Sequence, residues 1–96
     1  MDQPKEELPK EELKVDELLS LTLVQLISKA WAFLGMVSHP ETGKIKRDLE
    51  QARLAIDSIE AIYPLIKDKL GEEERRGVEL ELTNLRLNFV KQRSEQ

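Results

Sequence analysis

Two carboxylates on one predicted helix face are the residues best placed to bind a metal ion. Asp57 and Glu60 are three residues apart, so on a helix they lie side by side and could share a divalent cation. A hydrolase of this kind needs a second acidic pair on an adjacent helix, whereas Glu79 and Glu81 are two residues apart and point in different directions. Arg53, four residues before Asp57, instead predicts an ordinary surface ion pair. A divalent-metal-dependent helical hydrolase is therefore kept only as a second alternative.

The segment HPETGK, from His39 to Lys44, contains the other residues that could take part in catalysis or ligand binding. Gly43 and Lys44 match part of a phosphate-binding loop, but the earlier glycine and the following Ser or Thr of that motif are missing. The chain has one histidine and no cysteine, which excludes a di-iron site and leaves no visible machinery for covalent catalysis. Pro40 and Gly43 predict a four-residue turn in which His39 is exposed. We therefore predict no enzyme activity, no metal site and no cofactor.

The composition excludes further classes. With 96 residues, 35% of them charged and 40% hydrophobic, the chain is typical of one small soluble domain. A net charge of -4 leaves no large basic surface, so nucleic acid is not expected as a partner, and the cluster of Lys44, Lys46 and Arg47 is interpreted as solvated charge. The absence of cysteine fits a reducing compartment, and the charged beginning of the chain lacks a secretory signal. A cytoplasmic location is expected.

The beginning of the chain differs from the rest. Residues 1–13 contain two copies of PKEEL and too little apolar surface to form a core, so we expect a flexible charged tail. Residues 14–96 are expected to form a single helical domain.

The most apolar segment, residues 18–37, predicts the first helix. Fourteen of its twenty residues are apolar, and Thr22, Gln25 and Lys29 form one narrow polar stripe on a helix. We predict a helix over residues 14–36, with Gly35 as the stop. Such a helix needs cover on more than one side.

A second helix is predicted over residues 48–66. Asp48 followed by Gln51 is typical of a capping box at its start. Pro64 lacks an N–H and crowds the carbonyl of Glu60, which predicts a kink or an early end. The apolar residues at spacings of three and four, typical of a helix packed lengthwise on a neighbour, are Leu49, Ala52, Ile56, Ile59, Tyr63 and Ile66.

Residues 77–90, GVELELTNLRLNFV, allow two interpretations. Their alternating apolar residues would suit a β-hairpin, but its Thr-Asn turn lacks the glycine that two-residue turns favour, and Leu, Glu and Arg prefer helix to strand. We therefore predict a third helix over residues 72–92. Leu80 and Leu87 lie on a different side of it from its main apolar stripe, which consists of Val78, Leu82, Leu85 and Phe89.

Several stretches resemble a family of short bacterial all-helical proteins known only as domain of unknown function 1844. The resemblance covers about residues 18–91, and it is most specific in the pair Leu34-Gly35, the run PETGK, the pair Asp48-Leu49 and the ending LRLNFV. The chain departs from the family pattern at His39, Pro64 and Gly71. The resemblance implies an all-helical fold and brings no known activity or ligand.

The expected fold is all-α, a three-helix up-down-up bundle completed by dimerisation. If four or five large apolar side chains of the first helix stayed in water, roughly 6 to 15 kcal/mol would be forgone, which is comparable with the stability of a small domain. We therefore expect a non-enzymatic helical oligomerisation or protein-interaction module that forms a homodimer. The predicted interface consists of Leu19, Leu23, Leu26, Ile27, Trp31, Leu34, Leu80 and Leu87.

The first alternative is a membrane-associated protein that uses the apolar helix 18–37. Twenty residues are long enough to span a bilayer. The ten Leu, Ile, Val and Phe residues contribute about -3 to -6 kcal/mol to insertion, while Lys29 near the middle costs about 2.5 to 3.5 kcal/mol. The sum is near zero, and the aligned polar stripe favours a bundle or an interfacial helix over a span.

Overall fold

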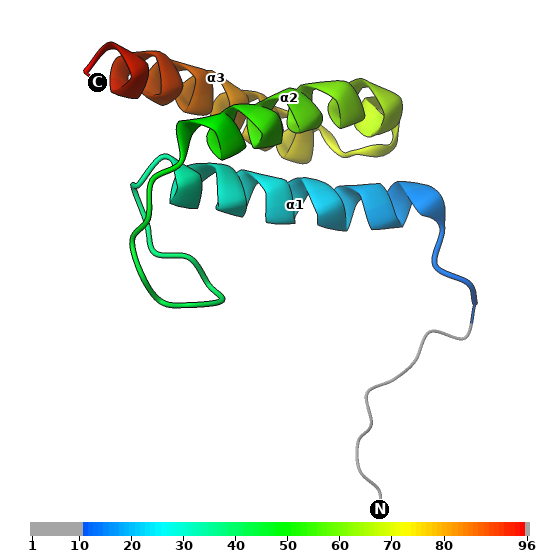
Figure 1. Cartoon of the computed structure of the whole chain (residues 1–96). Helices are drawn as coiled ribbons and strands as arrows, with labels where there is room; N and C mark the ends of the chain where they lie inside the picture. The colour runs from blue at the N-terminus through cyan, green and yellow to red at the C-terminus, as the bar shows by residue number, and fades with distance from the viewer. Residues whose placement is uncertain (1–10, 96) are drawn as a thin grey trace, which may run out of the picture.

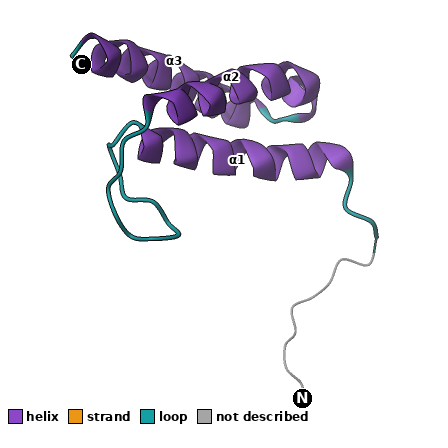
Figure 2. Ribbon diagram, in the orientation of Figure 1, coloured by secondary structure: helices purple, strands orange, loops and turns teal. Residues whose placement is uncertain are grey.

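The computed structural model describes residues 11–95 and is all-helical over this range. Its elements are α1 (Val15–Phe33), α2 (Leu49–Ile66), the short 3₁₀ turn η1 (Lys67–Lys69) and α3 (Glu72–Ser94). The chain reverses at each connection, so that α2 runs against α1 and α3 (Figure 1), and only loops and turns join the helices (Figure 2). The predicted all-α three-helix fold is confirmed, with helix ends within three residues of those expected. Residues 1–10 of the predicted tail lie outside the described residues.

The first helix ends at Phe33, and Gly35 two residues later is the predicted stop. The N–H of Gly35, whose φ is 81°, donates to the carbonyl of Ala32 at 2.9 Å, and the N–H of Met36 donates to the carbonyl of Trp31 at 3.1 Å. This pair of bonds is a Schellman motif, which needs a residue in the left-handed conformation that glycine adopts without strain.

This end divides the apolar run 18–37. At about 1.5 Å per residue, its helical part is about 24 Å long, short of the roughly 30 Å of a bilayer core. Within residues 11–95, no helix combines the length and the apolar character needed to cross a membrane.

The second helix begins at the predicted cap. The Asp48 carboxylate accepts the N–H of Gln51 at 3.2 Å, and the N–H of Asp48 donates to the carbonyl of Phe33 at 2.8 Å, which joins the start of α2 to the end of α1. Pro64 stays inside the helix, which continues to Ile66 before it tightens into η1. The predicted end at residue 66 is confirmed, so Pro64 does not end the helix early. The Ile66 side chain in the last turn is buried in the core.

Residues 77–90 are helical throughout, so the helical interpretation of the alternating pattern is confirmed. The N–H of Gly71 donates to the Glu74 carboxylate at 2.9 Å at the start of α3. Glu72 and Glu73 complete an acidic first turn, which complements the positive end of the helix dipole.

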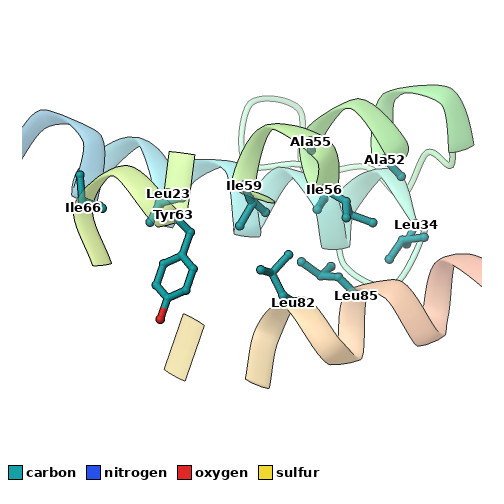
Figure 3. Packing of buried hydrophobic residues seen from close by; sticks show 11 residues of the cluster. Leu23, Leu34, Ala52, Ala55, Ile56, Ile59, Tyr63, Ile66, Leu82 and Leu85 are labelled. Atoms are coloured by element: carbon teal, nitrogen blue, oxygen red, sulfur yellow. The ribbon is translucent and has the colours of Figure 1, made fainter. Parts of the chain in front are cut away.

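The core lies along α2, between the other two helices (Figure 3). The core includes three small buried side chains, Ala52 and Ala55 on α2 and Ala30 on α1. Half of the buried apolar side chains come from α2, namely Ala52, Ala55, Ile56, Ile59, Tyr63 and Ile66. α3 is the longest helix, with 23 residues, yet it buries only Leu82 and Leu85.

The molecule is flat, with extents of 53 by 33 by 19 Å. A thickness of 19 Å is close to two helix diameters of about 10 Å. Each helix therefore keeps one long side toward the solvent.

We expect Gly35→Ala to destabilise the fold more than Gly43→Ala. Both glycines have positive φ, 81° and 70°, a conformation that costs a residue with a Cβ roughly 1 kcal/mol. An added Cβ at Gly35 would also lie 3.3 Å from the Cβ of Arg47, whereas at Gly43 it would meet nothing within 4 Å. Urea unfolding should show losses of about 2 kcal/mol for Gly35→Ala and about 1 kcal/mol for the Gly43→Ala control. Equal losses would contradict a restrictive contact with Arg47.

Candidate functional site

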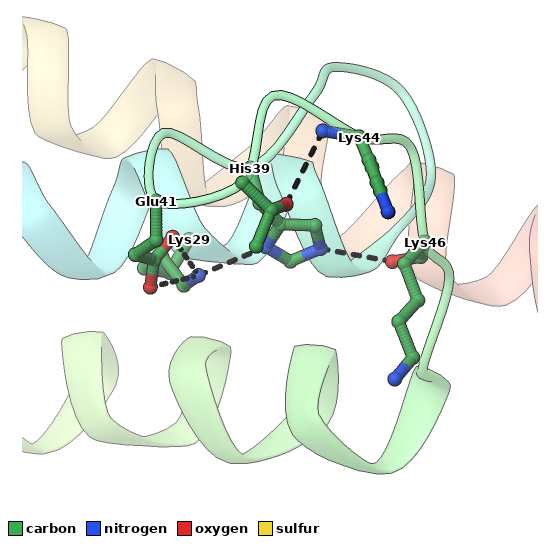
Figure 4. A network of polar contacts seen from close by, with 6 residues as sticks. Lys29, His39, Glu41, Lys44 and Lys46 are labelled. Carbon is green, nitrogen blue, oxygen red and sulfur yellow. Dashed lines mark hydrogen bonds and ion pairs between the residues drawn. The ribbon is translucent and has the colours of Figure 1, made fainter.

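The connection between α1 and α2 is held to α1 by His39 (Figure 4). The His39 side chain is buried, with its Nδ1 2.8 Å from the Nζ of Lys29 and its Nε2 2.9 Å from the carbonyl oxygen of Lys46. A lysine ammonium can only donate, so Nδ1 accepts from Lys29, and the Nε2–H donates to the Lys46 carbonyl. The prediction of an exposed turn histidine is therefore wrong. The ring is covered because it packs edge-on against Phe33, with the ring centroids 4.5 Å apart.

The turn around Pro40 spans five residues rather than the predicted four. The N–H of Gly43 donates to the carbonyl of His39 at 2.7 Å, and the N–H of His39 donates to the carbonyl of Lys44 at 2.9 Å. The N–H of Lys44 donates to the hydroxyl of Thr42 at 3.2 Å. A phosphate-binding loop would aim such N–H groups at its anion, whereas here they bond within the loop.

Lys29 on α1 makes the charged contacts of this connection. Its ammonium donates to both carboxylate oxygens of Glu41 at 2.9 Å and lies 4.8 Å from the centroid of the Phe33 ring. The hydrogen bond from Lys29, and then the backbone N–H of Glu41 itself, lower the pKa of the Glu41 carboxyl. The polar stripe that the sequence places on the first helix thus ends in a contact with the loop.

A pocket of about 550 Å³ opens between this loop and α1. Both ring nitrogens of His39 are already bonded, so neither has a lone pair available to act as a general base. The arrangement can contact a small anionic or apolar group, but it positions no acid–base pair. The pocket is lined by Lys29, Phe33, His39, Glu41, Thr42, Lys44, Ile45 and Lys46.

The carboxylates considered as metal ligands bond to basic side chains. Asp57 lies 3.8 Å from Arg53, which confirms the predicted surface ion pair, and Glu60 accepts from the guanidinium of Arg86 on α3. In the part of the chain that the structure describes, no three His, Cys, Asp or Glu side chains are grouped so that they could hold a metal ion.

Glu79 and Glu81 each join α3 to a different helix. The Tyr63 hydroxyl on α2 donates to Glu79 at 2.7 Å, and the Trp31 Nε1–H on α1 donates to Glu81 at 2.8 Å. Burial, and then the bond to Glu79, raise the pKa of Tyr63 to about 12. Neither bond was predicted from the sequence. The one available signal was that the chain's only Trp and only Tyr carry a donor group that needs a partner when the ring packs in a core.

The predicted interface residues fall into three groups. Leu23 and Leu34 are buried in the chain's own core. Four others are partly buried and pack against that core: Leu19, Leu26, Ile27 and Trp31. Leu80 and Leu87 are exposed, by 62% and 64%. Most of the α1 side chains expected at an interface are thus covered within the chain. The large apolar side chains that α1 leaves exposed are Val15, Leu18, Leu21 and Val24.

Residues 17–91 match the family described as Domain of unknown function (DUF1844). The chain belongs to this family. The DUF1844 match runs through all three helices and the loop with His39, and it confirms the resemblance seen in the sequence. No curated protein and no solved structure matches the chain.

In this DUF1844 member we expect His39→Leu to destabilise the fold by about 1 to 3 kcal/mol, because the Lys46 carbonyl and the Lys29 ammonium each lose a partner. Thr42→Ala in the same loop is the matched control, with an expected loss below about 0.5 kcal/mol since it removes only an exposed hydrogen bond, the one from the N–H of Lys44. Denaturant unfolding followed by circular dichroism measures both. A small and equal loss in the two variants would contradict the role given to His39.

We also expect the DUF1844 chain to lose stability at high pH through Tyr63. The pKa of folded Tyr63, about 12, lies above the value of about 10 in an unfolded chain. The contribution of the protonated phenol is therefore complete below pH 10 and is lost as the pH rises toward 12. Phenolate absorbance of this single tyrosine should titrate near pH 12 while the chain is folded, and Tyr63→Phe should lose less stability than the wild type between pH 10 and 12. Titration of the folded chain near pH 10 would refute this assignment.

Proposed function

We propose that the protein is a non-enzymatic helical module that self-associates through apolar side chains on the outer sides of its helices. The observation that carries this proposal is the exposure of large apolar residues within residues 11–95. These exposed residues are Leu13, Val15, Leu18, Leu21, Val24, Met36, Val37, Ile45, Leu54, Leu65, Leu80, Leu87 and Val90.

Alignment of these side chains matters more than their number, because single exposed leucines are normal on a protein surface. Leu80 and Leu87 are seven residues apart and form a row on α3, opposite the side that buries Leu82 and Leu85. Leu54 and Leu65 form a second row on α2. A row can be covered by one partner helix, whereas scattered residues cannot.

The energetic scale supports burial of a whole row. Covering a fully exposed leucine contributes about 1.5 to 3 kcal/mol, while association costs about 4 kcal/mol or more in lost freedom of motion. Two leucines from each of two chains are enough to offset the lower end of that cost. The outcome is an association that depends on protein concentration.

The α3 row is the best supported contact. α3 buries the fewest side chains of the three helices, and its leucines are more than 60% exposed. The polar side chains that could have served in catalysis instead hold elements of the fold together, which supports a role other than catalysis. These side chains are His39, Glu60, Glu79 and Glu81.

Light scattering of the full chain at about 50 µM should give a mass near 22 kDa, twice the 11.1 kDa of one chain. Leu80→Gln with Leu87→Gln should return the mass to that of one chain, because the row no longer gains from burial. The same two changes at Leu54 and Leu65 are the matched control and should leave the dimer intact.

A wild-type chain that stays monomeric at this concentration, without detergent, would overturn the proposal. If the chain instead co-sedimented with lipid vesicles and remained monomeric in their absence, the membrane alternative would replace it. Loss of the dimer in the α2 control alone would move the contact to α2.

A further inference from the structure

The outer side of α3 has a hollow near its beginning. The hollow is shallow and wide open to solvent, and it is lined by Arg76, Gly77, Glu79, Leu80 and Thr83. Gly77 has an ordinary helical backbone, and a Cβ placed on it would meet nothing within 4 Å. Glycine is the least favourable helix residue after proline, so Gly77 destabilises α3. No neighbouring side chain or backbone within the chain needs the space that the missing Cβ leaves.

The same side of α3 has a projecting side chain farther along. Leu87 is 64% exposed and follows Leu80 by seven residues, so the two point in nearly the same direction. Leu87 is ten residues beyond Gly77, about 15 Å along the helix axis. One helix face thus carries both a hollow and a side chain of the kind that fills one.

The charged residues on this face of α3 are acidic at its beginning and basic at its end. Exposed Glu73 lies seven residues before Leu80, in an acidic first turn, and exposed Lys91 lies four residues after Leu87, in a basic last turn. A parallel copy of α3 would place like charges together, whereas an antiparallel copy places each acidic end beside a basic end. Antiparallel helix dipoles also attract each other.

We infer that α3 pairs antiparallel with α3 of a second copy of this chain, with Leu87 of each copy filling the hollow at Gly77 of the other. In this register Glu73 lies level with Lys91 of the second copy, and Leu80 lies level with its Asn84. A hollow, a projecting leucine and two opposite charges on one helix satisfy the self-complementarity that a two-fold interface requires. This inference rests on the proposed self-association and specifies its geometry.

A charge exchange tests the register directly. Sedimentation velocity of the full chain at low salt should show that Glu73→Lys and Lys91→Glu each raise the dimer Kd by about fivefold to tenfold. The double variant restores both opposite-charge contacts and should return the Kd to within about twofold of the wild type. Glu50→Lys, in the exposed first turn of α2, is the matched control and should leave the Kd unchanged.

Gly77→Ala gives a second readout that misfolding cannot imitate. The added methyl group favours the helix, so the thermal midpoint of the dilute monomer should rise by about 4 °C. The same methyl group would lie between the two paired helices and keep Leu87 of the second copy away from the backbone at Gly77, so the dimer Kd should rise by about tenfold. Leu87→Ala should weaken the dimer to a similar degree by removing the side chain that fills the hollow.

The failures of the two proposals can be told apart. A wild-type dimer whose Kd is unchanged by Gly77→Ala, or in which the double charge variant is no better than the single ones, overturns this geometry and leaves self-association standing. A wild-type chain that is monomeric at about 50 µM overturns both.

Discussion

The packing of α1 and α3 on one helix, α2, is the constraint on which the rest of the structure depends. α2 contributes half of the buried apolar side chains, and Ile59 at its centre is completely covered. Because both other helices turn their apolar sides toward α2, the molecule is only 19 Å thick and every helix keeps an outer side. The exposed leucine rows follow from this arrangement, since no other helix within residues 11–95 covers them.

Polar contacts determine how the elements lie on that core. Tyr63 and Trp31 each donate to a glutamate of α3, which positions the third helix relative to the other two. His39 performs a similar role for the α1–α2 connection, because its two nitrogens join a helix side chain to the loop backbone. The side chains best suited to acid–base chemistry are thus used as structural ties.

The sequence anticipated the local structure because local rules decide it. Gly35 as the end of the first helix, Asp48 as a cap and the helical state of residues 77–90 all follow from propensity and hydrogen bonding over a few residues. The burial of His39 was not predictable in this way. It depends on Phe33 and Lys29 reaching the loop from α1, and no local pattern encodes that contact. The same holds for the bonds to Glu79 and Glu81.

The sequence by itself determined that the chain is all-helical, with three helices. Only the tertiary structure decided which apolar residues are left outside. Leu23 and Leu34 were predicted to lie at an interface, and the chain buries both in its own core, while Leu21 and Val24 on the same helix as Leu23 are exposed. Composition reveals how apolar a helix is. Its rotation about its own axis, however, is set by the side chains of the neighbours it packs against, and that rotation selects the surface available to a partner.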